Sequence, residues 1–251
     1  MQRVNRIVCA LLLAVGSKLP AGERTHLQRD GVSYEVYRCK PEEVRLFWKD
    51  SSGRPYEQFS QLQESLAGSG QRLVFAMNAG IFKQDGTGYS PCGLLVEDGR
   101  ISSPLNRESG RGNFYLKPNG VFFVAGGKAG VMETEEFAAA RISPRIATQS
   151  GPLLLRHGRT HPAFLSNSTS RLHRNGVGIV PNGDVIFAMT EFQPDNRVNL
   201  HGFAEFFRSL GCEDALFLDG DISAMWTPAD GPAPAGNHFA AILAVTEPAP
   251  K

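Results

Sequence analysis

The sequence contains little cysteine, four residues in 251. No two of them form a C-x-x-C pair, which argues against a structural zinc site. Removal of an N-terminal segment carrying Cys9 would leave Cys39, Cys92 and Cys212, so the mature chain can form at most one internal disulfide. The sequence does not show which pair would form, and we favour a free, buried thiol at Cys92 or Cys212.

The chain also lacks an excess of charge of one sign. Lysine and arginine total 26 against 25 aspartate and glutamate, and no basic run of the kind that follows a phosphate backbone occurs. Nucleic acid is therefore not an expected partner. The phosphate-loop, dinucleotide-binding, zinc-protease and hydrolase-elbow motifs are absent as well. These absences leave carboxylates and arginines as the candidate chemical groups.

No apolar run is long enough to cross a bilayer, which takes about 20 residues. The N-terminus instead carries Arg3 and Arg6, followed by an uncharged stretch over residues 7–15. This arrangement is typical of a secretory leader, so we predict a signal peptide over residues 1–21 and an exported protein, periplasmic or secreted. The alternative is a buried N-terminal strand or helix. The mature chain is predicted to have no membrane span.

Hydrophobic residues make up 41% of the chain, enough for one domain with a full core, which we place over residues 30–246. Short apolar or alternating runs between turn residues indicate many short strands. Helical spacing of apolar residues indicates few helices, over residues 56–66, 133–140 and 198–210. The sequence thus predicts an α+β fold, a single domain with a mixed, mostly antiparallel β-sheet core and a few helices.

Turn signals locate three predicted β-hairpins. Asn119-Gly120 separates predicted strands over 114–117 and 121–124, and Asn182-Gly183 separates predicted strands over 177–180 and 184–190. Asn-Gly is a strong signal for a two-residue hairpin turn. The third turn is expected at residues 97–100, which read Glu-Asp-Gly-Arg.

The apolar run over residues 215–218 stops abruptly at Asp219-Gly220-Asp221. Four consecutive apolar residues suit a strand buried on both faces, so both carboxylates should emerge together at its end. The spacing also imitates part of a calcium loop, but Ala224 stands where the sharp turn of such a loop needs glycine. A weaker divalent-cation site at Asp219 and Asp221 stays open, and no other cofactor is indicated. An ordinary turn explains an Asp-Gly pair equally well.

Arg174 lies in a glycine-rich stretch, residues 173–178, where backbone can approach a ligand closely. Its planar guanidinium can bind a phosphate or carboxylate through two parallel hydrogen bonds. A surface ion pair is an equally good explanation. Ser150 lies in a polar turn before another apolar run, but no base neighbours it in the sequence, so we do not predict that it is a nucleophile.

Six motifs occur in order along the chain: Met77-Asn-Ala-Gly-Ile-Phe82, Pro91-Cys-Gly-Leu-Leu-Val-Glu-Asp-Gly99, Gly112-Asn-Phe-Tyr-Leu-Lys-Pro-Asn-Gly120, Thr148-Gln-Ser-Gly-Pro152, Arg174-Asn-Gly-Val-Gly178 and Leu216-Phe-Leu-Asp-Gly220. This ordered set resembles the phosphodiester glycosidase family. The resemblance covers nearly all of the mature chain and is closest to a bacterial branch of that family.

The resemblance implies a set of substrate-binding residues that match the family's motifs: Asn78, Gly80, Ser150, Gly151, Arg174, Gly178, Gly220 and Ser223. Our own hypothesis takes Asp219 as the catalytic carboxylate, with Asp221 or Glu191 as the second one. The family's Leu-Asp-Gly-Gly-Gly-Ser-Ser motif is Leu218-Asp-Gly-Asp-Ile-Ser-Ala224 here. Two glycines of that motif are therefore missing, which changes the expected shape of the sugar pocket.

The function implied is hydrolysis of a sugar-1-phosphodiester, such as an N-acetylglucosamine-1-phosphodiester, at the anomeric carbon, with a small-molecule or glycan phosphodiester as substrate. Because phosphate is a weakly basic leaving group, positive charge from Arg174 matters more than a general acid. Asp219 would activate water or stabilise the transition state, and Asn78 and Ser223 would orient sugar hydroxyls. Two alternatives stay open: a metal-dependent phosphodiesterase using Asp219 and Asp221, and a non-catalytic envelope protein that binds glycans.

Overall fold

The computed structural model describes residues 19–86 and 88–250. Most of the predicted signal peptide, residues 1–18, therefore lies outside the described residues. Leu19, just before the predicted cleavage point, is buried in the core and its carbonyl accepts a hydrogen bond from Arg38 (2.8 Å). Cleavage near Ala21 would remove this contact.

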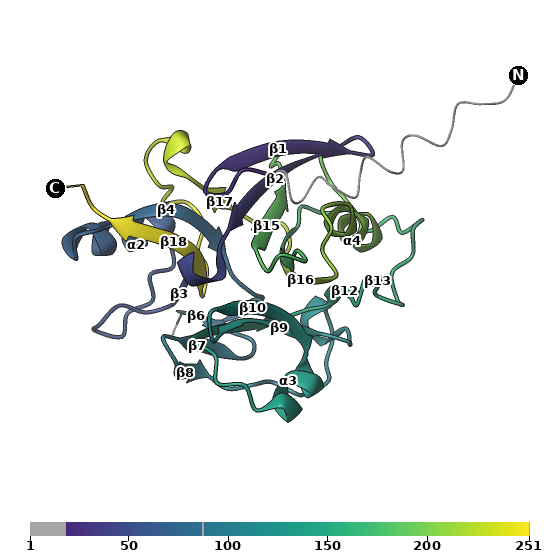
Figure 1. The fold of residues 1–251 in the computed structure, drawn as a ribbon, viewed down its shortest axis with the longest axis horizontal. Coiled ribbons are helices and arrows are strands. Elements are labelled where there is room, and N and C mark those ends of the chain that lie inside the picture. The colour runs from purple at the N-terminus through teal and green to yellow at the C-terminus, as the bar shows by residue number, and fades with distance from the viewer. Residues whose placement is uncertain (1–18, 87, 251) are drawn as a thin grey trace, which may run out of the picture.

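The largest sheet has seven strands in the order β1-β2-β15-β14-β16-β12-β13. Their bounds are Arg24–Arg29 (β1), Val32–Cys39 (β2), Val185–Thr190 (β15), Asn175–Ile179 (β14), Asp214–Asp219 (β16), Leu153–Arg156 (β12) and Arg159–Thr160 (β13). Helix α4 (Leu200–Ser209) covers one face of this sheet, on the right of Figure 1. Its buried Phe203, Phe206 and Phe207 explain the amphipathic pattern in the sequence.

Three smaller sheets complete the described part of the chain. The five-stranded sheet has the order β10 (Lys128–Glu133), β9 (Gly120–Ala125), β11 (Ile146–Ser150), β7 (Leu95–Glu97), β8 (Arg100–Ser103). The four-stranded sheet has the order β17 (Met225–Trp226), β4 (Gln71–Asn78), β18 (Ile242–Pro248), β3 (Val44–Phe47). The two-stranded sheet pairs β5 (Phe82–Asp85) with β6 (Gly88–Pro91). The remaining helices are α2 (Phe59–Gly68) and α3 (Thr134–Ala140), with short 3-10 turns at Pro41–Glu43, Asn113–Tyr115 and Pro228–Asp230. Within residues 19–86 and 88–250, none of the helices is long and apolar enough to span a bilayer.

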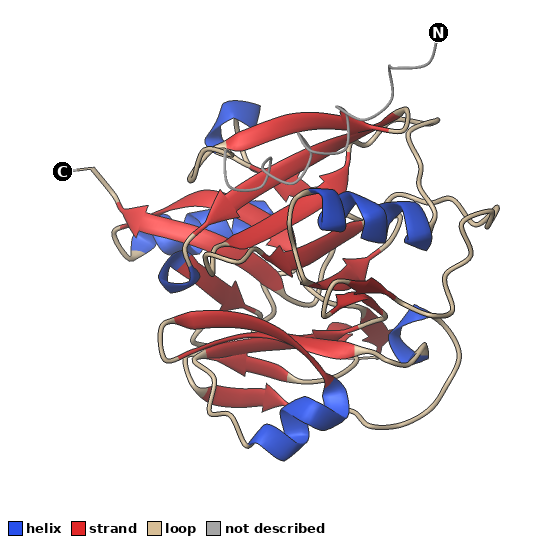
Figure 2. Cartoon of the chain, turned by 45° about the vertical axis from the view of Figure 1, so that its right-hand side comes forward, coloured by secondary structure: helices blue, strands red, loops and turns tan. Residues whose placement is uncertain are grey.

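The hydrophobic core lies where the three larger sheets meet. Phe187 of β15 stacks on Phe75 of β4, with ring centroids 5.1 Å apart, and meets Phe122 of β9 edge-on at 6.1 Å. All three side chains are fully buried. Figure 2 shows the red strands of these sheets closely stacked, with the blue helices on the outside. This shared core joins the sheets into one domain.

The predicted α+β class and its antiparallel sheets are confirmed, and every strand pairing in the described residues is antiparallel. The hairpins at 97–100 and 182–183 are confirmed as well. The prediction of a hairpin turn at Asn119-Gly120 is wrong. The buried Asn119 side chain accepts a hydrogen bond from the Thr134 hydroxyl and donates one to the Phe114 carbonyl, so it holds a loop and not a turn. The hairpin turn of β9 lies instead at Gly126-Gly127, both at positive φ.

The three described cysteines are free. Cys39 and Cys212 are buried and Cys92 is half-buried. This agrees with the predicted free thiols, and none of the three forms a disulfide with another.

Candidate active site at the end of strand β16

Asp219 is the last residue of β16, and an irregularity in the strand sets its direction. Asn175 of β14 lies opposite Asp219, while the next pair is Gly176 with Phe217, so Leu218 is the extra residue of a β-bulge. A bulge re-aims the side chain that follows it. Asp219 therefore lies beside Asn175, at the end of the sheet, instead of continuing the alternation of the buried strand.

The surroundings of Asp219 change its acidity. Burial raises the pKa of its carboxyl from 3.8 to about 7, opposed by a hydrogen bond from the Gly220 N–H to Oδ1 (2.7 Å). Among the described residues Asp219 forms no ion pair. Asp219 and Gly220 are nevertheless only half-buried by accessible surface, so solvent reaches this end of the strand. A carboxyl with a pKa near neutrality can accept or donate a proton at physiological pH.

The turn after β16 is held by its own hydrogen bonds. The Ser223 hydroxyl donates to the Gly220 carbonyl (2.5 Å), which also accepts the Ser223 N–H (2.8 Å). Asp221 is exposed, and its Oδ1 accepts the His173 N–H (3.0 Å), which ties the turn to the segment before β14. Gly220 faces open space: an added Cβ would meet nothing closer than the His173 carbonyl at 3.8 Å.

Two buried asparagines, Asn78 at the end of β4 and Asn175 on β14, join the second sheet to this site. Asn78 Oδ1 accepts hydrogen bonds from the Asn175 side chain and from the Ala224 N–H, both at 2.9 Å. Asn78 Nδ2 and Asn175 Oδ1 have no hydrogen-bond partner among the described residues. An unpaired donor and an unpaired acceptor next to Asp219 match the hydrogen-bonding capacity of a hydroxyl group or a water molecule.

Arg174 is only 1% exposed and has no carboxylate partner among the described residues. Its guanidinium donates to the carbonyls of Val198 (2.8 Å) and Ser170 (3.2 Å), while Nη1 has no partner. Burial lowers its pKa to about 10, so it stays charged at pH 7, and Asp221 opposes that shift. The structure therefore holds a buried positive charge at Arg174, close enough to Asp221 in the turn after β16 to interact with it electrostatically.

Several predicted substrate-binding residues hold the backbone together. The Ser150 hydroxyl donates to the Leu218 carbonyl (2.9 Å) and accepts the Ile81 N–H (3.1 Å). A Cβ on Gly80 would lie 2.6 Å from the Gln149 carbonyl, and one on Gly151 would lie 2.6 Å from Asn119 Cβ. The missing side chain of Gly178 leaves space for Phe207 of helix α4 and for Cys212. Their placement as ligand contacts stays a prediction.

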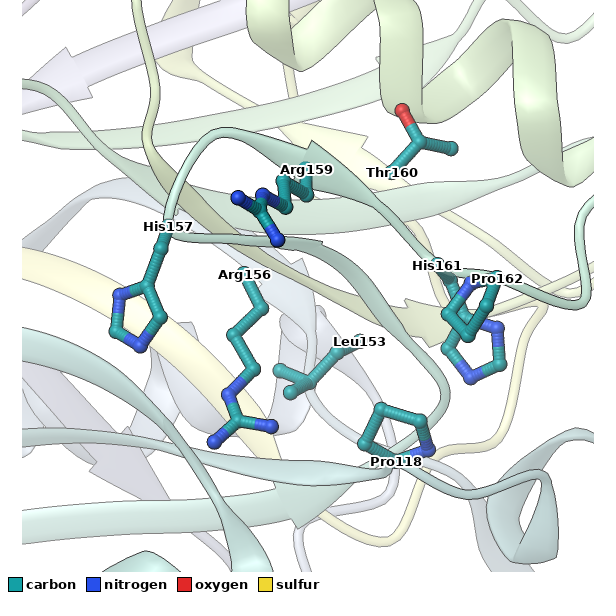
Figure 3. Close-up of a pocket in the computed structure, with 8 residues that line it drawn as sticks. All are labelled: Pro118, Leu153, Arg156, His157, Arg159, Thr160, His161 and Pro162. Carbon is teal, nitrogen blue, oxygen red and sulfur yellow. The ribbon is translucent and has the colours of Figure 1, made fainter.

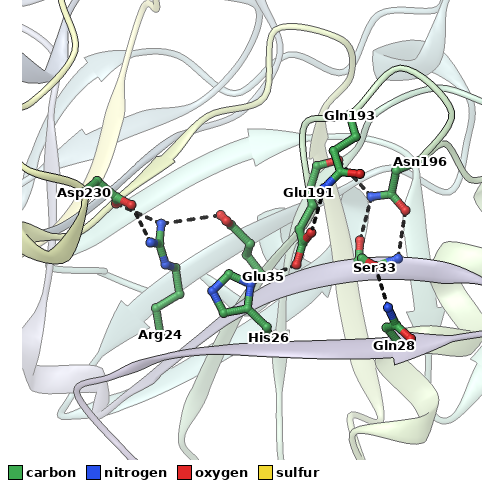
Figure 4. A network of polar contacts seen from close by, with 9 residues as sticks. All are labelled: Arg24, His26, Gln28, Ser33, Glu35, Glu191, Gln193, Asn196 and Asp230. Carbon is green, nitrogen blue, oxygen red and sulfur yellow. Dashed lines mark hydrogen bonds and ion pairs between the residues drawn. The ribbon is translucent and has the colours of Figure 1, made fainter.

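Glu191 lies in a different network from Asp219 (Figure 4). Its carboxylate pairs with His26 Nδ1 (2.8 Å), on the strand β1 that also carries Arg24. Arg24 in turn lies between Glu35 (3.7 Å) and Asp230. Burial raises the pKa of Glu35, and Arg24 opposes that shift. The described structure thus joins Asp219 with Asn78 and Asn175, while Glu191 is engaged with His26 on the outer strands.

Sequence reasoning missed Asn175 and Cys92, which lie near Asp219, and Lys83, which lies near Cys92. Asn175 was inside a motif that drew attention only to its arginine and glycines. Cys92 lies near Asp219: burial raises the pKa of its thiol, Lys83 lowers it and Asp219 raises it further. Lys83 follows Phe82 directly in the Asn78–Phe82 motif, a proximity that could have identified it. Among the described residues no group of three or more His, Cys, Asp or Glu side chains is placed to hold a metal ion.

Residues 71–242 match the phosphodiester glycosidase family. The chain is 34% identical over 198 residues to the uncharacterized protein YigE of Escherichia coli K12, covering 78% of this chain and 74% of that protein. The catalytic domain of zebrafish N-acetylglucosamine-1-phosphodiester alpha-N-acetylglucosaminidase, solved in a form auto-inhibited by its pro-peptide, has a similar fold. The TM-score is 0.61 at 16% identity, over 89% of this chain and 81% of that one. A putative exported protein of Burkholderia pseudomallei K96243 gives a TM-score of 0.58 at 11% identity, over 85% and 74%.

The family match covers most of the chain and includes Asn78, Arg174 and Asp219. The protein belongs to the phosphodiester glycosidase family.

Proposed function

We propose that the protein hydrolyses sugar-1-phosphodiesters at the anomeric carbon, as an exported enzyme acting on small-molecule or glycan phosphodiesters. The observation that carries this proposal is Asp219: a buried carboxyl with a pKa of about 7, at the open end of a strand, beside two asparagines with unpaired polar atoms. Membership of the family supports the reaction class. An N-acetylglucosamine-1-phosphodiester is the first substrate to test.

In the proposed reaction water attacks the anomeric carbon and Asp219, in its ionised form, takes the proton that the water loses. The bond between the anomeric carbon and the phosphate oxygen breaks, and its electron pair leaves with the phosphate. The products are a free sugar and a phosphomonoester. The leaving phosphate needs no general acid, because it is already a weak base.

Other residues of the site would position the substrate. Asn78 Nδ2 can donate to a sugar hydroxyl and Asn175 Oδ1 can accept from one, which would satisfy both unpaired atoms. The uncompensated charge of Arg174 favours a phosphodiester near the turn through the field of the buried guanidinium. Asp221, exposed and close enough to Arg174 to affect its pKa, stays our candidate for a second carboxylate.

The test is incubation of the purified protein with a panel of α-sugar-1-phosphodiesters, with and without chelator, and identification of products by mass spectrometry. Free sugar plus phosphomonoester, in the presence of chelator, is the expected result. Asp219→Asn should lower turnover by at least about 100-fold. Asp98→Asn is the matched control, because Asp98 lies on the exposed β7–β8 turn and should leave turnover unchanged.

Other products would contradict the proposal in distinct ways. A sugar phosphate, lost with chelator, would mean a metal-dependent phosphodiesterase that cleaves the phosphorus–oxygen bond. Saturable binding without product would mean a glycan-binding protein. Turnover of Asp219→Asn within a few-fold of the wild type would remove Asp219 from the mechanism.

A further inference from the structure

A cavity of about 680 Å³ lies at the β12–β13 hairpin, on the edge of the seven-stranded sheet (Figure 3). This volume is in the range of small-molecule sites. Its lining is Pro118, Leu153, Arg156, His157, Arg159, Thr160, His161 and Pro162. Four of these eight residues are arginine or histidine, and none is acidic. The cavity is therefore lined by basic side chains and by an apolar floor, which we define as Pro118, Leu153 and Pro162.

The cavity is distinct from the Asp219 site. None of the residues assigned to that site lines it. Leu153, on its floor, lies opposite Leu216 of β16, three residues before Asp219. At about 3.4 Å per residue along a strand, the two sites are roughly 10 Å apart.

Arg159 gives the cavity its uncompensated charge. It is exposed and forms no ion pair with any described residue. Arg156, in contrast, pairs with Glu136 through Nη2. His157 Nδ1 lies 3.9 Å from Asp214. Arg156 and Arg159 lie opposite each other on the two strands of the hairpin. In Figure 3 the Arg156 side chain points down from its strand, and the Arg159 guanidinium lies between the two strands.

Two further donors at the cavity lack acceptors. Arg156 Nε and His161 Nε2 are two of the five buried side-chain polar atoms that have no hydrogen-bond partner in the described chain. The Ala163 N–H donates to His161 Nδ1 (3.1 Å), so the proton of the neutral ring is on Nε2. Burial lowers the pKa of the imidazole, and a backbone interaction with Lys117 opposes that shift. Of the two donors, Arg156 Nε is therefore the one that lacks any acceptor nearby. A buried donor without an acceptor destabilises the free protein, and a ligand that supplies an acceptor removes that cost.

We propose that this cavity binds a small organic anion of the size of a sugar phosphate or sugar carboxylate. Its anionic group contacts the guanidinium of Arg159 and accepts one hydrogen bond from the Nε–H of Arg156. A rotation of the half-exposed Arg156 side chain turns this N–H toward the ligand. The apolar face of the ligand rests on Pro118, Leu153 and Pro162. His161 forms the polar wall of the same space.

The test is calorimetric and NMR titration of the full chain with four probes: glucose 6-phosphate, glucuronate, inorganic phosphate and glucose. We expect glucose 6-phosphate to bind most tightly, glucose not to bind, and the imidazole signals of His161 to shift on binding. Arg159→Gln should weaken glucose 6-phosphate binding at least tenfold. Arg111→Gln is the matched control, since Arg111 is also exposed without an ion pair in the described structure, and should change the Kd less than twofold.

Three results would overturn this assignment. The first is no shift of the His161 signals at millimolar glucose 6-phosphate, and the second is equal weakening by Arg111→Gln, which would mean diffuse charge attraction. The third is inorganic phosphate binding as tightly as glucose 6-phosphate, which would remove the role of the apolar floor. Asp219→Asn should bind the probes like the wild type, so failure here is independent of the proposed hydrolysis.

Discussion

Three aspartates of this chain show how the surroundings of one side chain determine its chemistry. Burial raises the pKa of Asp219 to about 7, with only one N–H hydrogen bond in opposition. Burial would also raise the pKa of Asp184, but hydrogen bonds from Lys40 and Arg38 outweigh it and keep that pKa below its usual value. Asp221 is exposed. Of Asp219 and Asp184, Asp219 is therefore the one whose pKa lies near neutral pH, which makes it the candidate for proton transfer.

The first prediction at this scale concerns the pH dependence of hydrolysis. If ionised Asp219 takes the proton from water, kcat/KM should rise about tenfold per pH unit below pH 7 and level off above it. The measurement is kcat/KM between pH 4.5 and 9 on a phosphodiester substrate. A decline through pH 7 would show instead that the protonated form is active and that Asp219 is a general acid.

The second prediction uses Cys92 as a reporter of Asp219. Burial raises the pKa of this thiol, Lys83 lowers it, and the Asp219 carboxylate raises it further. At pH 8, Asp219→Asn should therefore speed alkylation of Cys92, and Lys83→Gln should slow it, because the thiolate is the reactive form. Mass-spectrometric mapping gives the rate at Cys92, with buried Cys39 and Cys212 as internal references. Identical rates in both variants would show that neither group influences the thiol.

At the scale of elements, the contact between α4 and β14 depends on missing side chains. Cβ atoms on Gly176 and Gly178 would approach the helix residue Phe207 to 3.1 and 2.7 Å, and one on Gly178 would also lie 2.7 Å from Cys212 Sγ. These distances are shorter than van der Waals contact. The glycines of the Arg174–Gly178 motif thus allow a helix to pack closely on the strand that carries Asn175.

A pair of alanine substitutions should separate packing from ligand access. Gly178→Ala should lower the free energy of unfolding by about 1–3 kcal/mol, because Phe207 and Cys212 must move. Gly220→Ala should leave stability unchanged, since space is open there, but should raise KM if substrate passes over the turn. Urea unfolding and steady-state kinetics on both variants measure this. Equal free energies of unfolding for the two variants would mean that helix α4 can shift to accommodate the added methyl group without loss of stability.

At the scale of the whole molecule, the candidate site lies where the three larger sheets meet. Asp219 and Asn175 come from the seven-stranded sheet, Asn78 from the four-stranded sheet, and Ser150 from the five-stranded sheet. The Ser150 hydroxyl bridges to Leu218 and Ile81, so each sheet contributes backbone or side chain to the same place. If the three sheets separated, the residues of the site would therefore no longer lie together.

Ionisation of Asp219 should also change the free energy of unfolding of the whole protein. Its pKa of about 7 in the folded state exceeds the value near 3.9 expected for the unfolded chain, so the folded state binds more protons between those pH values. The contribution of Asp219 to stability is full below about pH 4 and is lost as pH rises toward 7. At pH 8, Asp219→Asn should be more stable than the wild type by on the order of 4 kcal/mol.

Urea unfolding of both proteins at pH 4.5 and pH 8 tests this, and the difference between them should fall to about 1 kcal/mol at the lower pH. Asp98→Asn, an exposed control, should follow the wild type at both values. A difference between Asp219→Asn and wild type that does not change with pH would mean that burial does not perturb the Asp219 carboxyl.

The sequence by itself determined the features that depend on neighbouring residues: the amphipathic helix α4, the hairpin at 182–183, the buried strand that ends at Asp219, and the family to which these motifs belong. Periodicity and turn chemistry are local, so they can be read along the chain. Asn119-Gly120 shows the limit, because its buried hydrogen bonds reach Phe114 and Thr134 and override the turn signal.

Only the tertiary structure decided which polar groups meet. Asn78 and Asn175 are 97 positions apart, yet they share a hydrogen bond beside Asp219. Glu191 pairs with His26, 165 positions away. The pKa of Asp219 depends on how much protein surrounds the carboxyl, and that is a property of three packed sheets and not of the residues next to it. Burial and long-range contact exist only after the chain has folded, which is why the chemistry of the site could not be read from its motifs alone.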